Sequence, residues 1–586
     1  MMAFIKDKNI ERATTVMLTE AERVKRFGFT ATELTRQKES ILREAESAYM
    51  ERDSKESGWM AYDFTGYFLK GLPLPGPAYH YDFCKQYLGG ITLEEVNDIA
   101  KSWVTPGKNL VIVVTAPEKE GLDIPSDVAL LSLVDKVHNS KIEAYSDEII
   151  SAPLIAKAPL PGKVVNEKKL EQSGITEWTL SNGVKVILKP TTFKKDEIIV
   201  YGFSWGGSSR YSDDEFLSVN NCGGIVDESG AGSLNEMQLN KYLQGKILWN
   251  YSYVSDYEEI LGGQSSNKDL ESLLQLHYLA FMNPGNDKNG YAAYISKTQS
   301  FIENQGARPE KVFEDSIRVV MSQYHKRREP MNISKLNKIN SEVAYKAYKE
   351  RFSGADDFTF LFVGSFTPDS IKPLVEKYIA SLPVTQQREH WKDAGIRLAR
   401  GNHTKTIYKG SEPKSRVSLQ FAGDYQWSAA NNMTADALME LIRIKLREKL
   451  REEKGGTYGV SCSMTKNRIP AEEYNIAVSF GCAPENVESL MADALHEIEL
   501  VKQNGVSADD LIKVKELMKR QHETDLQENW VWASKLMESY KYNDDPSEIF
   551  TFDKLLTDVT ASGLTQTAVK LFNSDNYSRF VLMPAK

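Results

Sequence analysis

Two distant stretches of the chain share one pattern: AERVKRFGFTATELTRQKESIL at residues 21–42 and EIELVKQNGVSADDLIKVKELM at residues 497–518. Each predicts a helix, a glycine, a capping threonine or serine, and a second helix. Gly28 aligns with Gly505, and glycine suits the left-handed residue that follows a helix end. Self-similarity of this kind indicates a repeated structural unit.

The two copies also end alike. ITLEEVNDIAKSWVTPGKNLVIVVTAP begins at Ile91, and VTASGLTQTAVKLFNSDNYSRFVLMPAK begins at Val559. A third version, INSEVAYKAYKERFSGADDFTFLFVG, begins at Ile339. Each predicts a helix that leads into an apolar strand, placed at Leu110–Val114 in the first copy and at Arg579–Met583 in the last. Three such endings indicate three related units.

The front of a unit is predicted from its strands. From Trp178 the sequence alternates polar and apolar residues around Asn182-Gly183, a strong hairpin signal. Residues 405–423 repeat this pattern, and an amphipathic helix from Thr434 to Gly455-Gly456 and two strands follow. Two strands, a helix, two strands, further helices and a final strand predict an α+β fold with helices over mostly antiparallel sheets.

The first unit lacks such a front, because its first helix begins only a few residues into the sequence. A half-unit of this kind would leave a helix face and a sheet edge uncovered. We therefore expect either that the chain is a fragment or that a partner completes it. After this unit, Pro153, Pro159 and Pro161 with polar neighbours predict an extended linker.

Composition excludes several classes. The formal charge of −9 is spread over both signs, without the basic stripe that a nucleic-acid-binding protein needs. No apolar run has the length of a membrane-spanning helix, and the first residues do not have the pattern of a signal peptide. The compartment stays open. The four cysteines are scattered, which predicts no disulfide framework and no structural zinc site.

The histidines do not form a zinc-hydrolase motif. HExxH and its inversion HxxEH place two histidines one helical turn apart on a shared face, and none of the eight histidines has another four residues away. His496 is interpreted as a polar helix residue, and His277, in LLQLHYLAF, as a core histidine with its hydrogen bonds satisfied. We therefore expect no self-sufficient zinc enzyme.

One pair of side chains carries candidate chemistry. Arg451 and Tyr458 lie in LREKLREEKGGTYGVS, on either side of the Gly-Gly turn between a helix and a strand. A guanidinium and a phenol at such a junction could both donate to a substrate carbonyl. The alternative is structural: an arginine that neutralises the helix end and a tyrosine half-buried in a sheet.

The repeats and the R-x6-Y spacing together resemble the C-terminal part of an M16-family zinc metallopeptidase, of the insulinase, pitrilysin and presequence-protease type. The resemblance implies tandem homologous M16-type (LuxS/MPP-like) domains. Residues 1–140 would be the back half of a second domain, 141–174 a linker, 175–390 a third domain without a zinc motif, and 391–586 a fourth domain with the Arg–Tyr motif.

By this resemblance, Arg451 and Tyr458 contact the substrate backbone and support the transition state. Zinc belongs to an absent first domain that bears HxxEH, so this chain has no cofactor of its own. The expected partners are a peptide substrate and that N-terminal half, in the same or a partner chain, with no nucleic acid and no membrane segment. Two alternatives remain: a naturally separate non-catalytic subunit of an M16 peptidase, and a retired homologue that serves as a scaffold.

Overall fold

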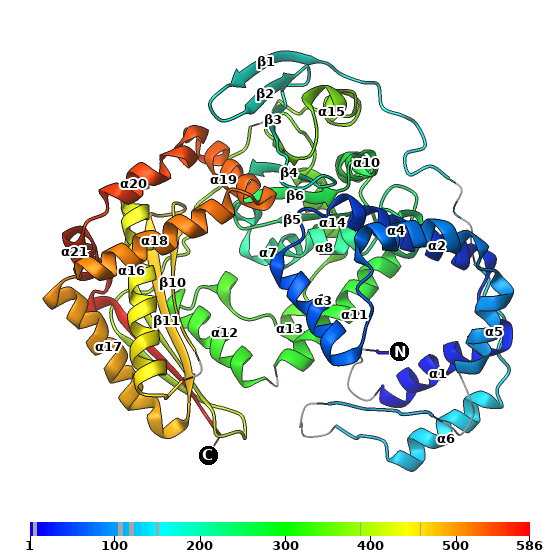
Figure 1. The fold of residues 1–586 in the computed structure, drawn as a ribbon, viewed down its shortest axis with the longest axis horizontal. Helices are drawn as coiled ribbons and strands as arrows, with labels where there is room; N and C mark the ends of the chain where they lie inside the picture. The colour runs from blue at the N-terminus through cyan, green and yellow to red at the C-terminus, as the bar shows by residue number, and fades with distance from the viewer. Residues whose placement is uncertain are drawn as a thin grey trace. The chain divides into compact units, whose positions relative to one another are not determined.

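The computed structural model describes residues 1–3, 9–103, 109–116, 122–147, 150, 152–306, 308–386, 388–457 and 459–585 (Figure 1). These residues form two compact units, each assembled from separate stretches of the chain. Unit 1 comprises Met1–Glu303, Ile333–Trp391 and Asn529–Tyr542, and unit 2 comprises Asn304–Asn332, Lys392–Glu528 and Asn543–Lys586. Each unit contains one sheet covered by helices, which confirms the predicted α+β class.

Unit 1 begins with helices alone. These are α1 (Ile10–Phe27), α2 (Ala31–Met50), α3 (Ser57–Lys70), α4 (Gly76–Tyr87), the short η1 (Leu88–Gly90), α5 (Leu93–Trp103) and α6 (Asp127–His138). The chain enters α2 through the predicted capping box, in which Thr30 and Glu33 satisfy each other's backbone N–H groups. Arg43, buried on α2, anchors this helix to the sheet region by ion pairs with Asp196 and Asp269.

The sheet of unit 1 has seven strands in the order β1-β2-β3-β7-β4-β6-β5. The strands are β1 (Val164–Leu170), β2 (Ile175–Leu180), β3 (Lys185–Pro190), β4 (Ile198–Trp205), β5 (Leu248–Val254), β6 (Glu258–Ser265) and β7 (Thr359–Gly364). The predicted Asn182-Gly183 hairpin joins β2 to β3, with Gly183 at φ 87°. All neighbouring pairs are antiparallel except β3 and β7, which are parallel.

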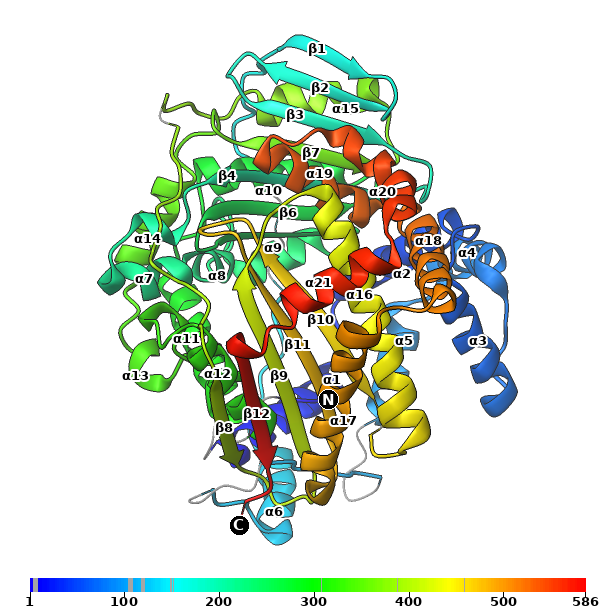
Figure 2. The same cartoon turned by 90° about the vertical axis from the view of Figure 1, so that its left-hand side faces the viewer.

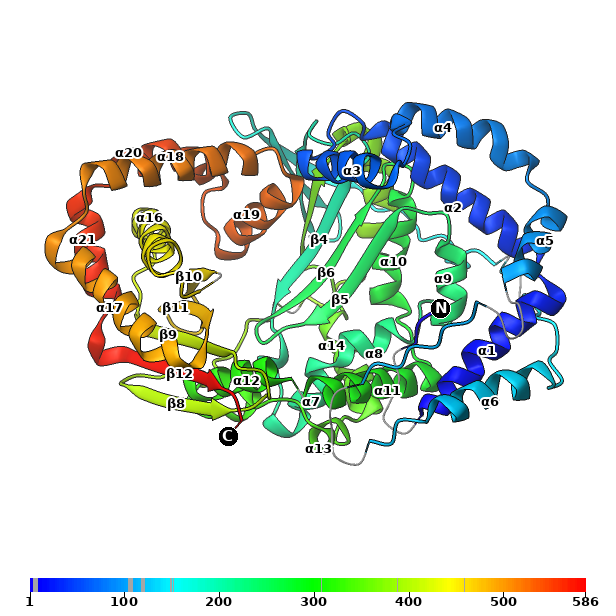
Figure 3. The same ribbon diagram turned by 60° about the horizontal axis from the view of Figure 1, so that its bottom comes forward.

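Helices cover both faces of this sheet. The remaining helical segments of unit 1 are η2 (Ser208–Arg210), α7 (Asp213–Asn220), α8 (Cys222–Asp227), α9 (Glu236–Leu243), α10 (Leu270–Met282), α11 (Lys288–Gln305, which ends across the boundary), α13 (Ile333–Leu336), α14 (Ser341–Arg351), α15 (Pro368–Leu374), η4 (Val375–Ile379) and α19 (Asn529–Tyr542). Figure 3 shows α10 on one side of β4 and β6 and α19 on the other. Although α19 lies between two stretches of unit 2 in the sequence, it packs on β4 and β7 of unit 1.

Unit 2 has a five-stranded sheet in the order β10-β11-β9-β12-β8 (Figure 2). Its strands are β8 (His403–Tyr408), β9 (Ser415–Asp424), β10 (Val460–Asn467), β11 (Glu473–Cys482) and β12 (Tyr577–Met583). Its helices are α12 (Pro309–Met321), η3 (Lys326–Arg328), α16 (Ala429–Leu446), the π-helical η5 (Arg447–Glu453), η6 (Pro484–Asn486), α17 (Val487–Asn504), α18 (Ala508–Asp525), η7 (Pro546–Thr551), α20 (Phe552–Asp558), α21 (Ala561–Leu571) and η8 (Ser574–Asn576). This is the predicted order of strands and helices.

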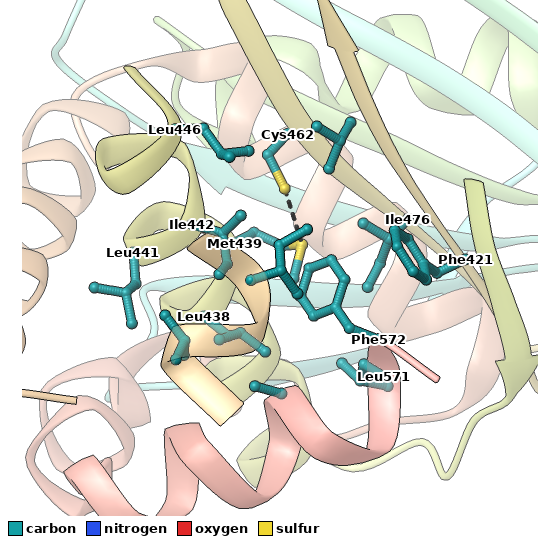
Figure 4. Packing of buried hydrophobic residues seen from close by; sticks show 14 of the residues in the cluster. Phe421, Leu438, Met439, Leu441, Ile442, Leu446, Cys462, Ile476, Leu571 and Phe572 are labelled. Atoms are coloured by element: carbon teal, nitrogen blue, oxygen red, sulfur yellow. Dashed lines mark hydrogen bonds between the residues drawn. The ribbon is translucent and has the colours of Figure 1, made fainter. Parts of the chain in front are cut away.

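Alternation along β12 explains why both faces of this sheet are covered. Val581 joins the core beneath α16, α17 and α21, whereas Phe580 and Leu582 point to a smaller core formed with α12. In the larger core, the side chains of α16 interlock with those of β9 and β11, and Cys462 Sγ lies 3.7 Å from Met439 Sδ (Figure 4).

The repeat predicted from the sequence is present in the helices. α1 and α17 each have 18 residues, α3 and α19 each have 14, and α5 and α21 each have 11. Gly28 (φ 74°, ψ −169°) and Gly505 (φ 79°, ψ −171°) take the same conformation after the first helix of each copy. This corrects the left-handed prediction: φ is positive, but ψ is extended, a conformation that is nearly restricted to glycine.

Two segments differ from the expected strands. Residues 110–116 contain the predicted Leu110–Val114 strand, yet they pair with no described neighbour, and Val111 and Val113 are 81% and 77% exposed. Their counterpart β12 pairs with β8 and β9. The first repeat, residues 1–140, contains no described strand with which residues 110–116 could pair. Conversely, Val164–Leu170, within the stretch predicted as a linker, forms the edge strand β1.

Candidate functional site

Arg451 lies near the end of a helix that changes its hydrogen-bonding pattern. Nine of the 18 residues of α16 are buried, and at Arg447 the helix continues as the π-helical η5. Leu450 is fully buried and holds η5 to the core, while Arg451 beside it is exposed. Gly455 and Gly456 then end the segment by donating to the carbonyls of Arg451 and Leu450, over 3.1 and 3.2 Å. π-helical insertions of this kind often lie at functional sites.

The other basic side chains of this segment have carboxylate partners. Lys449 lies 2.8 Å from Glu453, and Lys454 lies 3.5 Å from Asp493. Arg451, by contrast, forms no side-chain hydrogen bond or ion pair with any residue that the structure describes. Its guanidinium is therefore available to a ligand.

Tyr458 lies outside the described residues, so its pairing with Arg451 stays a prediction. The residues on either side of it are held together. Thr457 is buried, and its hydroxyl donates to the carbonyl of Gly459 over 2.9 Å and accepts from the Gly459 N–H over 3.2 Å. β10 begins immediately afterwards, at Val460.

In unit 1, helix α8 belongs to a tightly packed core. Cys222 of α8 is fully buried, and burial raises the pKa of its thiol to about 12. A Cβ on Gly223 would lie 2.3 Å from the carbonyl oxygen of Ser252 in β5, so α8 rests directly on the sheet. Nowhere in the described ranges do three or more histidine, cysteine, aspartate or glutamate side chains form a group that could hold a metal. The described residues therefore do not fit a zinc site.

Unit 1 also contains a polar cavity of about 580 Å³ at one end of its sheet, lined from β4, β6, α14 and the chain around Glu389. Arg351 forms ion pairs with Glu259, at 3.3 Å, and with Glu389. Glu259 also accepts hydrogen bonds from the Gly207 N–H at 2.8 Å and from Ser204 Oγ at 2.9 Å. The charged groups of Arg351, Glu259 and Glu389 therefore pair with one another and link α14, β6 and the chain around Glu389.

Burial of this network shifts its acids toward the neutral form. Burial raises the pKa of Glu259, against the opposing effects of Arg351 and the hydrogen bonds. The pKa of Asp357, on the wall of the same cavity, is raised to about 7 by burial and then by the charges of Glu259 and Asp356. No local sequence pattern indicates this cluster, because its members are far apart in the chain.

His277 is buried as predicted, but its hydrogen bonds are not satisfied. Within the described part of the chain neither ring nitrogen has a hydrogen-bond partner, so that part of the prediction is wrong. Burial lowers the pKa of His277 to about 4, and the nearby backbone of Gly262 opposes this shift without reaching hydrogen-bond geometry. The ring is a neutral core side chain on α10. His496, in contrast, is an exposed residue of α17, as predicted.

The family match includes the Arg451 segment. Residues 338–518 match the model of the peptidase M16 inactive domain. Over these residues the chain is similar to the peptidase M16 inactive domain. The resemblance to M16 peptidases is thereby confirmed, and the matched residues extend from the end of the third predicted domain through η5 and β10 into α18.

The M16 relatives are named as zinc proteases. A zinc protease PQQL-like protein of Arabidopsis thaliana is 24% identical over 540 residues, which are 89% of this chain and 53% of that protein. The probable zinc protease PqqL of Escherichia coli (strain K12) is 23% identical over 594 residues, which are 99% of this chain and 62% of that protein. The chain thus spans little more than half the length of these curated relatives.

Solved structures confirm the tandem M16-type fold. The periplasmic protease PqqL of Escherichia coli has a TM-score of 0.65 at 20% identity, over 99% of this chain and 64% of that one. The ferredoxin protease FusC, solved in complex with Arabidopsis ferredoxin, has a TM-score of 0.67 at 18% identity, with the same coverage. The first half of PqqL alone matches 73% of this chain at 14% identity with a TM-score of 0.56, so this chain is also similar in fold to that half.

Among the helices that the structure describes, none is both long enough and apolar enough to cross a membrane.

Proposed function

We propose that this chain is the C-terminal, zinc-free portion of an M16 metalloendopeptidase. In this role it encloses a peptide substrate and supplies Arg451 and Tyr458 to an active site that an HxxEH-bearing domain completes. Zinc is expected in that domain and not among the residues of this chain.

The observation that carries this proposal is the state of Arg451. In η5 and its C-cap residue, Arg451 is the base that stays free of described partners, while Lys449 and Lys454 are engaged with carboxylates. A structural arginine at a helix end would be expected to contact a neighbouring acid or the last carbonyls. The family match covers this segment, and the zinc-protease names of the relatives support peptide hydrolysis as the reaction.

The chemistry proposed for the pair is donation of hydrogen bonds. A guanidinium carries five N–H donors and a phenol carries one O–H donor, so both can hold a peptide carbonyl. Hydrogen bonds that involve a charged group are about twice as strong as neutral ones, and they strengthen further when the carbonyl oxygen becomes an oxyanion. Arg451 and Tyr458 would then bind the substrate backbone and favour the tetrahedral transition state.

Reconstitution tests the proposal. The chain is mixed with an HxxEH-bearing half from the same source, and cleavage of a quenched fluorescent peptide is followed. We expect cleavage from the mixture only, and we expect Arg451→Ala and Tyr458→Phe each to lower turnover by roughly 10²–10³, the usual cost of losing an oxyanion donor.

A matched control is available on the same helical segment. Arg447 is 53% exposed and pairs with Glu452 at 3.8 Å, so Arg447→Ala removes the same charge from a position with no proposed role. We expect it to change turnover less than about 2-fold. Wild-type rates for both Arg451→Ala and Tyr458→Phe would remove the pair from the mechanism and favour the scaffold alternative. If the HxxEH half is encoded by a separate gene, the partner-subunit alternative is correct.

A further inference from the structure

α3 exposes an unusual amount of apolar surface. None of its 14 residues is buried, although its sequence, SGWMAYDFTGYFLK, is rich in aromatic residues. The exposed fractions of its large apolar side chains are 62% for Trp59, 43% for Met60, 70% for Tyr62, 57% for Phe64, 56% for Tyr67, 84% for Phe68 and 70% for Leu69. Figure 2 shows α3 beside α2 and α4, at the edge of the view. Apolar surface of this extent typically marks a site of interaction with another protein.

The internal repeat identifies the counterpart of this helix. α1, α2 and α3 occur in the same order as α17, α18 and α19, and α3 and α19 have equal lengths. The position of α19 in the fold therefore indicates what α3 is built to contact.

α19 packs on a sheet that precedes its own repeat in the sequence. Trp532 lies beneath the Lys189 ammonium of β3, 4.2 Å from it, and Tyr540 donates to Glu177 of β2 over 2.6 Å. At the end of the helix, Lys541 forms an ion pair with Glu258 of β6 at 2.5 Å. The helix thus covers one face of the seven-stranded sheet.

The two helices can be compared by counting from the first residue of each, Ser57 and Asn529. Trp59, Met60 and Phe64 take the places of Val531, Trp532 and Leu536, which are only 5%, 4% and 1% exposed on α19. On the opposite side of the helix, Tyr62 takes the place of Ser534, which is exposed. α3 therefore has the apolar face that α19 buries, without a described sheet beneath it.

We propose that α3 docks through Trp59, Met60 and Phe64 onto a face of the sheet in the HxxEH-bearing domain, as α19 docks onto the sheet of unit 1. This inference rests on the proposed function, since it names the docking surface for the partner required there. The curated relatives have length beyond the part that this chain matches, which provides room for such a domain.

Hydrogen exchange and binding measurements test this. The probe is the HxxEH-bearing polypeptide with the glutamate of its motif changed to glutamine, so that it binds without cleaving. We expect amides of residues 57–70 to gain protection in the complex. Trp59→Glu and Phe64→Glu should each weaken binding by roughly 10–100-fold, as expected for buried aromatic anchors. Tyr62→Glu places the same charge on the opposite side of the helix and should change binding less than about 3-fold.

Each outcome bears on one of the two proposals. Binding that protects α3 but yields no cleavage with the unmodified HxxEH half sustains the docking surface and overturns the proposed function. Cleavage with α3 unprotected, and with Trp59→Glu and Phe64→Glu at wild-type affinity, overturns the docking surface alone. Concentration-dependent dimerisation of the isolated chain that Trp59→Glu abolishes would assign α3 to a second copy instead. Circular dichroism of each variant checks that the exposed substitutions leave the fold intact.

Discussion

Asn529 donates a hydrogen bond from Nδ2 to Oε1 of Glu197 across 2.9 Å, although 332 residues separate them. Asn529 is fully buried at the start of α19, and its Oδ1 accepts from Thr191 Oγ1 at 2.6 Å. The side-chain amide of Asn529 therefore joins α19 to the chain between β3 and β4 in unit 1.

Replacing this amide should destabilise unit 1. In Asn529→Ala the buried Glu197 and the half-buried Thr191 each lose a partner, and an unsatisfied buried polar group costs about 1–3 kcal/mol. We expect the free energy of unfolding, measured in urea, to fall by that amount. Ser534→Ala, at an exposed position of the same helix, should stay within about 0.5 kcal/mol of wild type. Equal stabilities of Asn529→Ala and wild type would contradict the anchoring role.

His277 should make the protein less stable in acid. Its folded pKa of about 4 lies below the ordinary value of 6.5, so between these values the unfolded chain takes up a proton that the folded chain does not. Stability is lost as pH falls from 6.5 to 4, by up to about 3 kcal/mol at 1.36 kcal/mol per unit. The free energy of unfolding of His277→Leu should therefore fall less steeply than that of wild type as the pH is lowered across this range. His496→Leu, at an exposed position, should have the same pH dependence as wild type. If His277→Leu also has the wild-type pH dependence, His277 is not the group responsible.

Asp357 should act in the opposite direction. Its folded pKa of about 7 lies above its ordinary value of 3.8, so its contribution to stability is fully present below pH 3.8 and is lost as pH rises through 7. Asp357→Asn removes this loss, and because the group is only partly buried we expect a gain of about 1 kcal/mol at pH 8. Thermal melts between pH 5 and 8 would show it. The exposed Asp98, paired with Lys101, supplies the control Asp98→Asn. A variant less stable than wild type at pH 8 would mean that the charged carboxylate is stabilising.

Metal content tests whether the zinc of the proposed peptidase lies outside this chain. We expect the isolated protein to bind no stoichiometric zinc, because the described acids, histidines and cysteines do not gather into a ligand set. Mass spectrometry of the native protein after dialysis against zinc would measure this. One tightly bound zinc per chain would contradict the proposal that the metal belongs to another domain. The chelator EDTA should leave the melting temperature of the isolated chain unchanged.

Local signals in the sequence predicted most of the secondary structure. The Asn182-Gly183 turn, the capping threonine at residue 30 and the glycine after each first helix act through neighbouring residues, so a single stretch reveals them. The repeat then fixed the order of elements in both units. Arg451 is a candidate on the same kind of local signal, its spacing to Tyr458 and its place at the helix end, and its role stays a prediction.

Long-range pairing was beyond such reasoning. Val164–Leu170 becomes a strand because β2 offers it a free edge, while residues 110–116, with a stronger strand pattern, have no described edge to join. The unpaired ring of His277 and the cluster around Arg351 depend on residues contributed by separate elements. Neither the local pattern nor the repeat contains that information.

The position of α19 has a consequence for biosynthesis. During translation, the seven strands of unit 1 emerge long before residues 529–542, so the sheet face over β4 and β7 stays bare while all the strands but one of unit 2 are still being made. Burial of that face is therefore one of the last steps of folding. A ribosome that stops before residue 529 would release a chain with an open apolar sheet, the kind of intermediate that chaperones bind and that otherwise aggregates.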